Sequence, residues 1–71
     1  MQLKISPQDS LMRLTPKHRS QTEAKVGYPT NFENGVLIVD VPDQDAGSKK
    51  RIRLIGADLR AQLGDIGVIR L

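Results

Sequence analysis

The chain has 71 residues, no cysteine and one histidine, and its formal charge is +3. A chain of this length forms a single small domain with a thin core, and the lack of cysteine excludes a disulfide framework. No apolar run is long enough to cross a bilayer, and the start of the chain does not have the pattern of a signal peptide. We therefore expect one soluble, cytoplasmic domain over residues 1–71, without a membrane partner.

Residues 1–34 give the weaker structural signals, and we expect this N-terminal segment to be less ordered than the rest. The stretch "QLKIS" is typical of a short strand, and Ser6 followed by Pro7 is a pattern that starts helices. Residues 15–27 form a polar arm with almost no apolar face. A solvated loop, a mobile arm and a marginal helix are therefore all compatible with this arm.

A strand is expected over residues 25–33, before the turn signal Asn34-Gly35. Pro29 cannot donate a ladder hydrogen bond, so it would confine this strand to the edge of a sheet. The strand would pair with residues 36–41, which begin the more strongly patterned core segment.

The core segment, residues 35–71, opens with a predicted hairpin between residues 36–41 and 50–55. "GVLIVDV" is rich in β-branched residues, "PDQDAGS" supplies turn residues, and "KRIRLI" alternates charged and apolar residues. With Val41 opposite Lys50, the apolar side chains share one face of the hairpin. The charged side chains then share the other face: Asp40, Arg51 and Arg53.

A short helix is predicted over residues 57–63, because Leu59 and Leu63 are one helical repeat apart and Gly64 suits a helix end. A C-terminal strand follows over residues 66–71. Since this strand carries apolar residues on both faces, it should pair centrally or across a subunit boundary. The predicted class is mainly β with short helices, a β-rich α+β fold, built as a small sheet or a small barrel.

No residue pattern indicates catalysis, a cofactor or a metal. His18 lies in the most polar segment without a carboxylate to orient it. There is no glycine-rich phosphate loop and no nucleophile elbow. Asp40, Asp43 and Asp45 lack the distal glutamate of a calcium loop and are ordinary hairpin-loop residues. We expect a non-enzymatic protein with no cofactor, no metal and no small-molecule substrate.

The clearest functional feature is a cluster of cations that we predict as a nucleic-acid-binding site. On a strand, Arg51 and Arg53 project to the same side and could contact phosphates or enter a groove. Only 3% of the residues are aromatic, so single-stranded bases have no stacking platform. We therefore expect a regulatory module that binds duplex DNA through a basic hairpin, as a homodimer. Its predicted binding residues are Lys49, Lys50, Arg51, Arg53 and Arg60.

An alternative explains the same charges without nucleic acid. Arg51 could pair only with Asp40 across the hairpin, an exposed contact of about 0.2–1 kcal/mol. Lys49 and Lys50 could simply keep a sheet edge soluble. The chain would then be a protein–protein interaction or assembly and inhibitor module, with an SH3-like small β-barrel and a protein partner.

The stretch "RIRLIGADLRAQLGDIGVIRL", residues 51–71, resembles the strand-helix-strand signature of swapped-hairpin DNA-binding domains of the AbrB and MazE type. Arg53 and Leu54 match the strand, and Gly64-Asp65 match the dipeptide before the last strand. The residues that match the helix are Leu59, Arg60, Leu63 and Gly64. The resemblance implies an intertwined homodimer that grips DNA with basic residues of its N-terminal hairpin.

Overall fold

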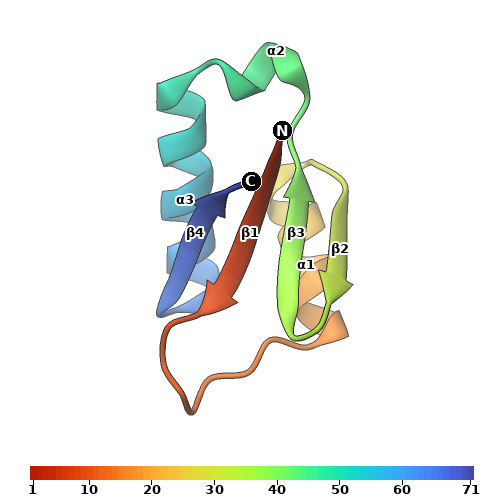
Figure 1. Ribbon diagram of the computed structural model, residues 1–71, viewed down its shortest axis with the longest axis vertical. Helices are drawn as coiled ribbons and strands as arrows, with labels where there is room; N and C mark the ends of the chain where they lie inside the picture. Colours follow the sequence, from red (N-terminus) through yellow and green to blue (C-terminus); the bar gives the residue numbers. More distant parts are fainter.

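The computed structural model describes residues 1–71, which form four strands and three helices (Figure 1). The elements are β1 (Gln2–Pro7), α1 (Pro16–Val26), β2 (Thr30–Glu33), β3 (Val36–Asp40), α2 (Asp43–Ala46), α3 (Lys49–Leu63) and β4 (Ile66–Arg70). The strands form one antiparallel sheet in the order β2-β3-β1-β4. The predicted α+β class is confirmed. The sheet is open, so the small-barrel alternative is wrong: β2 and β4 lie at opposite edges and do not pair.

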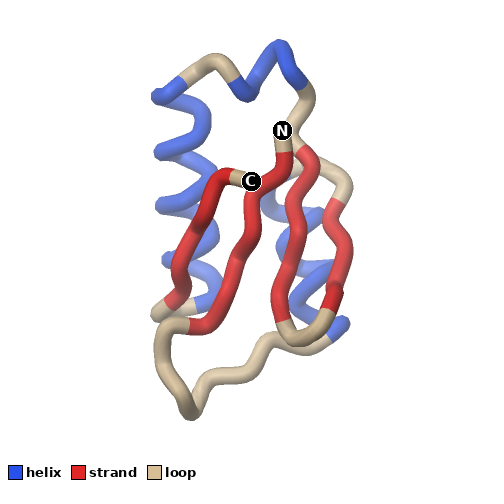
Figure 2. Tube along the Cα trace, viewed as in Figure 1, coloured by secondary structure: helices blue, strands red, loops and turns tan.

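The topology combines two split βαβ units. In each unit, β1-α1-β2 and β3-α3-β4, a strand of the other unit lies between the two strands that the helix connects. This β-α-β-β-α-β order is that of ferredoxin-like folds, with α2 added as one short turn before α3. Figures 1 and 2 show α1 and α3 behind the sheet, so one face is covered by helices and the other is uncovered.

The core lies between the sheet and the two long helices. Successive strand residues point to opposite faces, so Leu3 and Ile5 of β1 point toward the helices. The antiparallel register pairs them with Val39 and Leu37 of β3, which are equally buried. Leu59 of α3 is also fully buried against this layer. Each such side chain stabilises the fold by roughly 1.5–3 kcal/mol, which makes the few central ones decisive in a chain of this size.

The predicted hairpin between residues 36–41 and 50–55 is wrong, because residues 50–55 belong to α3. Both sides of β3 are already occupied, by β1 and β2, so no edge is available for a further strand. The charged–apolar alternation spans only a few residues, whereas a helical apolar stripe extends through the whole of α3. That stripe consists of Ile52, Ile55, Leu59 and Leu63. The predicted helix over residues 57–63 is confirmed as the second half of α3.

The segment 1–34 contains β1, α1 and β2, and β1 is one of the two central strands. The helix start predicted at Pro7 is wrong, since Pro7 ends β1 and pairs with Ile66. Of the three alternatives for the polar arm, the structure shows the helix, α1. The turn at Asn34-Gly35 is confirmed, with φ values of 50° and 80° that join β2 to β3.

The C-terminal strand is confirmed as β4, and it pairs only with β1. A central position, one of its two expected placements, is therefore excluded, and β4 forms an edge of the sheet. None of the three helices has the length and apolar character needed to cross a membrane.

Candidate nucleic-acid interface

The predicted binding residues lie on α3 rather than on a hairpin. Ser48 starts this helix, because its hydroxyl accepts a hydrogen bond of 3.1 Å from the backbone N–H of Arg51. The helix has 15 residues and is therefore about 22 Å long. The sequence signals for it were Ser48 as a cap and the apolar spacing that runs on to Leu63.

The first turn of α3 carries an unusual concentration of positive charge. Lys49, Lys50 and Arg51 all lie there, and the turn contains no acidic residue. A helix N-terminus already bears a partial positive charge, so cations at this position are unfavourable by about 0.3–1 kcal/mol each. Residues 49–71 hold six of the eleven Lys and Arg residues but only two of the eight acidic ones. The molecule is thus electrostatically polarised, with its positive end at α3 and β4.

The helix separates the predicted residues into two groups. At about 100° per residue, Lys49, Arg53 and Arg60 fall on one flank of α3. Lys50 and Arg51 point elsewhere and border a second depression with Ser48 and Leu54. The structure therefore brings together three of the five predicted residues along one line and sets the other two apart.

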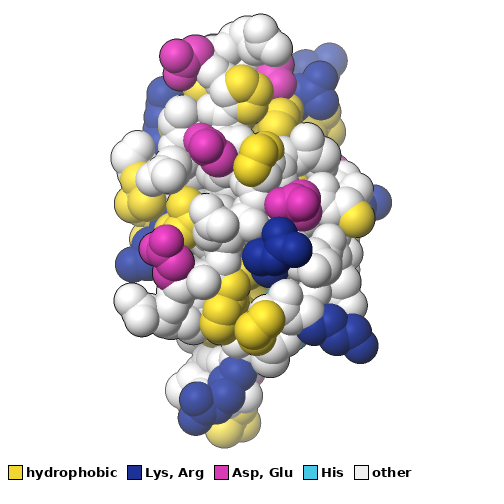
Figure 3. All heavy atoms as spheres, turned by 90° about the vertical axis from the view of Figure 1, so that its right-hand side faces the viewer, with side chains coloured by type: hydrophobic (Ala, Val, Ile, Leu, Met, Phe, Trp, Pro, Cys, Tyr) yellow, Lys and Arg dark blue, Asp and Glu magenta, His cyan; other side chains and the backbone are white.

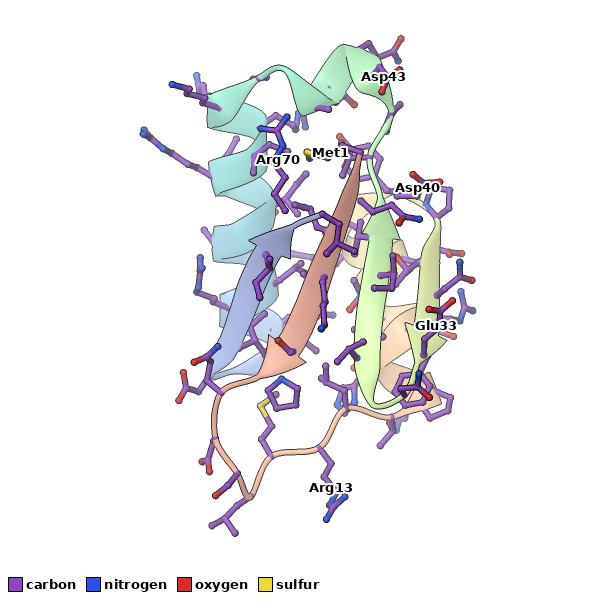
Figure 4. The ribbon with its side chains drawn as sticks, in the orientation of Figure 1. Met1, Arg13, Glu33, Asp40, Asp43 and Arg70 are labelled. Carbon is purple, nitrogen blue, oxygen red and sulfur yellow. The ribbon has the colours of Figure 1, made fainter.

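Arg70 of β4 joins the flank that carries Lys49 and Arg53. These three cations surround a shallow depression of about 340 Å³, whose other lining residues are Ala46, Gly47 and Ile52. Arg70 lies opposite Leu3 in the sheet, so its side chain is on the helix-covered face. Figure 4 shows it rising from the end of β4 toward the connection between α2 and α3. Its position depends on β4 returning beside α3, which no sequence motif indicates.

Arg60 extends the same line beyond Gly56. A Cβ placed on Gly56 would lie 3.1 Å from Nη1 of Arg60, so the guanidinium rests directly over the bare backbone of this glycine. Helical side chains lean toward the N-terminus, which directs Arg60 back toward Arg53. We call Lys49, Arg53, Arg60 and Arg70 the basic flank.

No member of the basic flank makes an ion pair. The two ion pairs of the structure join Arg19 to Glu23, at 3.0 Å, and the amino group of Met1 to Asp43, at 3.8 Å. The depression beside Lys49 is lined by no carboxylate. The β2 side of the molecule is different, because acidic and basic side chains are mixed there (Figure 3). The basic flank is thus a surface of one sign, available to an anionic partner.

The uncovered face of the sheet has no aromatic residue on its two central strands. β1 presents Gln2, Lys4 and Ser6 on this face, and β3 presents Val36, Ile38 and Asp40. The single phenylalanine, Phe32, lies opposite Leu37 and therefore on the helix side. The single tyrosine, Tyr28, is in the loop after α1. This face therefore offers no stacking platform for unpaired bases.

The other candidate groups have structural partners. His18 Nδ1 accepts a hydrogen bond of 2.9 Å from the backbone N–H of Thr15, which caps the start of α1. Asp45 accepts a hydrogen bond from the Tyr28 hydroxyl. Nowhere do three or more His, Cys, Asp or Glu side chains come together in a way that could hold a metal ion.

Comparison of the chain with known protein families, with curated protein sequences and with solved structures gave no match. Arg53 and Leu54, which correspond to a strand in the AbrB and MazE resemblance, lie in α3, whereas Leu59 and Leu63 lie in a helix in both. The features of this chain that indicate a function are therefore those of its surface chemistry.

Proposed function

We propose that this chain is a small, non-enzymatic regulatory module that binds the phosphate backbone of duplex DNA through α3. The observation that carries the proposal is the basic flank, whose cations come from two elements and have no acidic partner. A cation that already has an acidic partner must give up that partner to bind a phosphate. The cations of the basic flank give up only water and counterions when they bind a phosphate. Arginine adds a planar fork that donates two hydrogen bonds to one phosphate.

Duplex DNA is favoured by the shape and chemistry of the surface. The outer side of α3 is exposed along the helix, and a major groove about 12 Å wide admits an exposed α-helix. The lack of aromatic residues on the uncovered sheet face argues against a single-stranded ligand. Lys50 and Arg51 then supply additional backbone contacts near the start of α3. We place the protein in the cytoplasm as a homodimer, without cofactor.

The test is fluorescence anisotropy with labelled duplex DNA, structured RNA and single-stranded DNA at several salt concentrations. We expect duplex binding that weakens as salt rises. The double variant Lys49→Gln/Arg53→Gln should bind more weakly, and the slope of log affinity against log salt should become shallower by about two, one for each lost phosphate contact.

The matched control is Lys17→Gln/Lys25→Gln on α1. It removes the same charge from exposed positions and leaves the basic flank intact. Equal slopes in the two double variants would show that net charge, rather than the basic flank, governs binding. Lack of binding to all three nucleic acids at low salt would refute the proposed function.

A protein-interaction module is the second candidate, and one observation favours it. The uncovered sheet face carries partly exposed Ile38 together with Ile69 and Leu71, which are 51% and 62% exposed. Apolar groups on an open surface suit a protein partner. Binding through them would persist at high salt, and the protein would bind duplex DNA weakly or not at all in the same anisotropy experiment.

A further inference from the structure

We propose that the outer edge of β4 is a self-association surface, on which a second copy of this chain pairs its own β4 in antiparallel orientation. The two sheets would then continue as one. This inference names the interface of the homodimer proposed above. It does not depend on nucleic-acid binding, because it rests on the backbone and side chains of β4.

The two edges of the sheet differ in protection. β2 is a four-residue strand, it is preceded by Pro29, and it exposes the polar residues Asn31 and Glu33. Short length, proline and charge are the features that keep edge strands from pairing with other chains. β4 has five residues and no proline; like β2 it contains one charged residue, Arg70, but three of its five residues are Ile or Val. Its edge is therefore the one left open to another strand, and no strand lies beyond it in Figure 2.

The hydrogen bonds to β1 show which backbone groups of β4 are unpaired. Gln8 N–H donates to the carbonyl of Asp65 at 3.0 Å, and Leu71 N–H donates to the carbonyl of Gln2 at 2.9 Å. Hydrogen-bonded pairs alternate along an antiparallel ladder, so the odd-numbered residues of β4 bond to β1. The N–H and C=O groups of Val68 and Arg70 consequently point outward, away from the sheet.

A two-fold axis through Val68 satisfies these outward groups. Val68 then faces Val68 of the second copy, and Arg70 faces Ile66, so every hydrogen-bonded pair joins residues whose polar groups point outward. Arg70 does not lie opposite Arg70 of the second copy, so two like charges are not placed directly opposite each other. Ile69, half exposed in a single chain, comes to lie beside Gly67 of the second copy. This match of the strand to itself identifies a second copy as the occupant.

The pairing would place two basic flanks on the same side of the joined sheet. Arg70 belongs to both the pairing strand and the basic flank, so the flanks approach each other near the two-fold axis. Their repulsion is screened by salt, so self-association should strengthen as salt rises. DNA binding should respond to salt in the opposite direction, which makes failure of one proposal distinguishable from failure of the other.

The first experiment is sedimentation equilibrium of the full chain without nucleic acid, over a range of protein concentrations at low and moderate salt. We expect the mass to rise from one chain to two with concentration. Val68→Pro should remain one chain, because it removes an outward N–H that a single copy does not use and so spares the β1–β4 ladder. Val68→Thr keeps the N–H and should still form dimers. A wild-type protein that remains one chain at every concentration overturns the proposal.

If Val68→Pro fails to fold, a cross-linking experiment tests whether β4 pairs with β4 of a second copy. The natural chain has no cysteine, so one introduced thiol reports on one position. In Val68→Cys the two thiols face each other across a pair whose Cα atoms are about 5.5 Å apart, a distance that a disulfide spans. Leu54→Cys, exposed on α3, is the control. We expect covalent dimers from Val68→Cys at concentrations where Leu54→Cys gives few; equal yields overturn the proposal.

Discussion

The phenolic hydroxyl of Tyr28 donates a hydrogen bond of 2.8 Å to Oδ2 of Asp45, which joins the loop after α1 to the short helix α2. This bond favours the protonated phenol and is the main reason that the pKa of Tyr28 lies above 10.0. Partial burial and the negative charge of Asp45 also raise this pKa, whereas the positive charge of Arg51 lowers it. The folded state therefore holds the proton to a higher pH than the unfolded chain. The resulting stability is present below pH 10.0 and is lost as pH rises through the folded-state pKa.

Tyr28 is the only tyrosine, so absorbance titration of tyrosinate measures its pKa directly. We expect the pKa of the folded protein to exceed that of the chemically unfolded chain. Asp45→Asn should lower the pKa of Tyr28 toward 10.0, because it removes the carboxylate. An unchanged pKa in Asp45→Asn would show that the hydrogen bond does not form in solution.

Thr22 is the one fully buried side chain of α1, and its hydroxyl has no hydrogen-bond partner. Thr22→Val replaces the hydroxyl by a methyl group of similar size. Because a buried unsatisfied hydroxyl is costly, we expect the free energy of unfolding to rise by about 1 kcal/mol. Urea unfolding followed by circular dichroism measures the change. Thr22→Ser, which keeps the hydroxyl and loses the methyl group, should be destabilised; a destabilised Thr22→Val would contradict the prediction.

Gly35 has a φ of 80° in the turn between β2 and β3. A side chain there is strained even though the space around it is open, so Gly35→Ala should lower the free energy of unfolding by about 1 kcal/mol. Gly47 provides the comparison, since it also has open space but a φ of −77°. Gly47→Ala should be neutral or stabilising by up to about 1 kcal/mol. Equal effects at the two positions in thermal or urea unfolding would argue against the turn geometry.

Lys49 lies in the first turn of α3, where its charge opposes the helix dipole. Lys49→Glu should raise the free energy of unfolding by about 0.3–1 kcal/mol at low salt, and Lys49→Gln by less. Both variants should bind duplex DNA more weakly, with Lys49→Glu the weaker. Urea unfolding and anisotropy on the same samples measure the two effects. Loss of stability in Lys49→Glu would show that the positive charge of Lys49 stabilises the fold, in contradiction to this prediction.

Local patterns predicted β1, β3, β4 and the Asn34-Gly35 turn correctly, because each depends on residues that are adjacent in the chain. Alternating β-branched residues suit a half-buried strand, and a two-residue turn with positive φ values needs Asn and Gly. Local patterns could not decide the conformation of the polar arm, residues 15–27, because α1 has no broad apolar face. This helix is held by a cap at Thr15 and His18 and by packing against the rest of the molecule.

The segment 50–55 satisfied two periodicities at once, because Ile52 and Leu54 alternate with arginines while Ile52 and Ile55 begin a helical stripe. The cation cluster was visible in the sequence, but its geometry was not. By itself the sequence determined an α+β chain with a basic C-terminal third and no aromatic stacking surface. Only the tertiary structure decided that the cations lie on a helix beside Arg70, because β1 and β2 occupy both sides of β3 and leave residues 50–55 no strand to pair with.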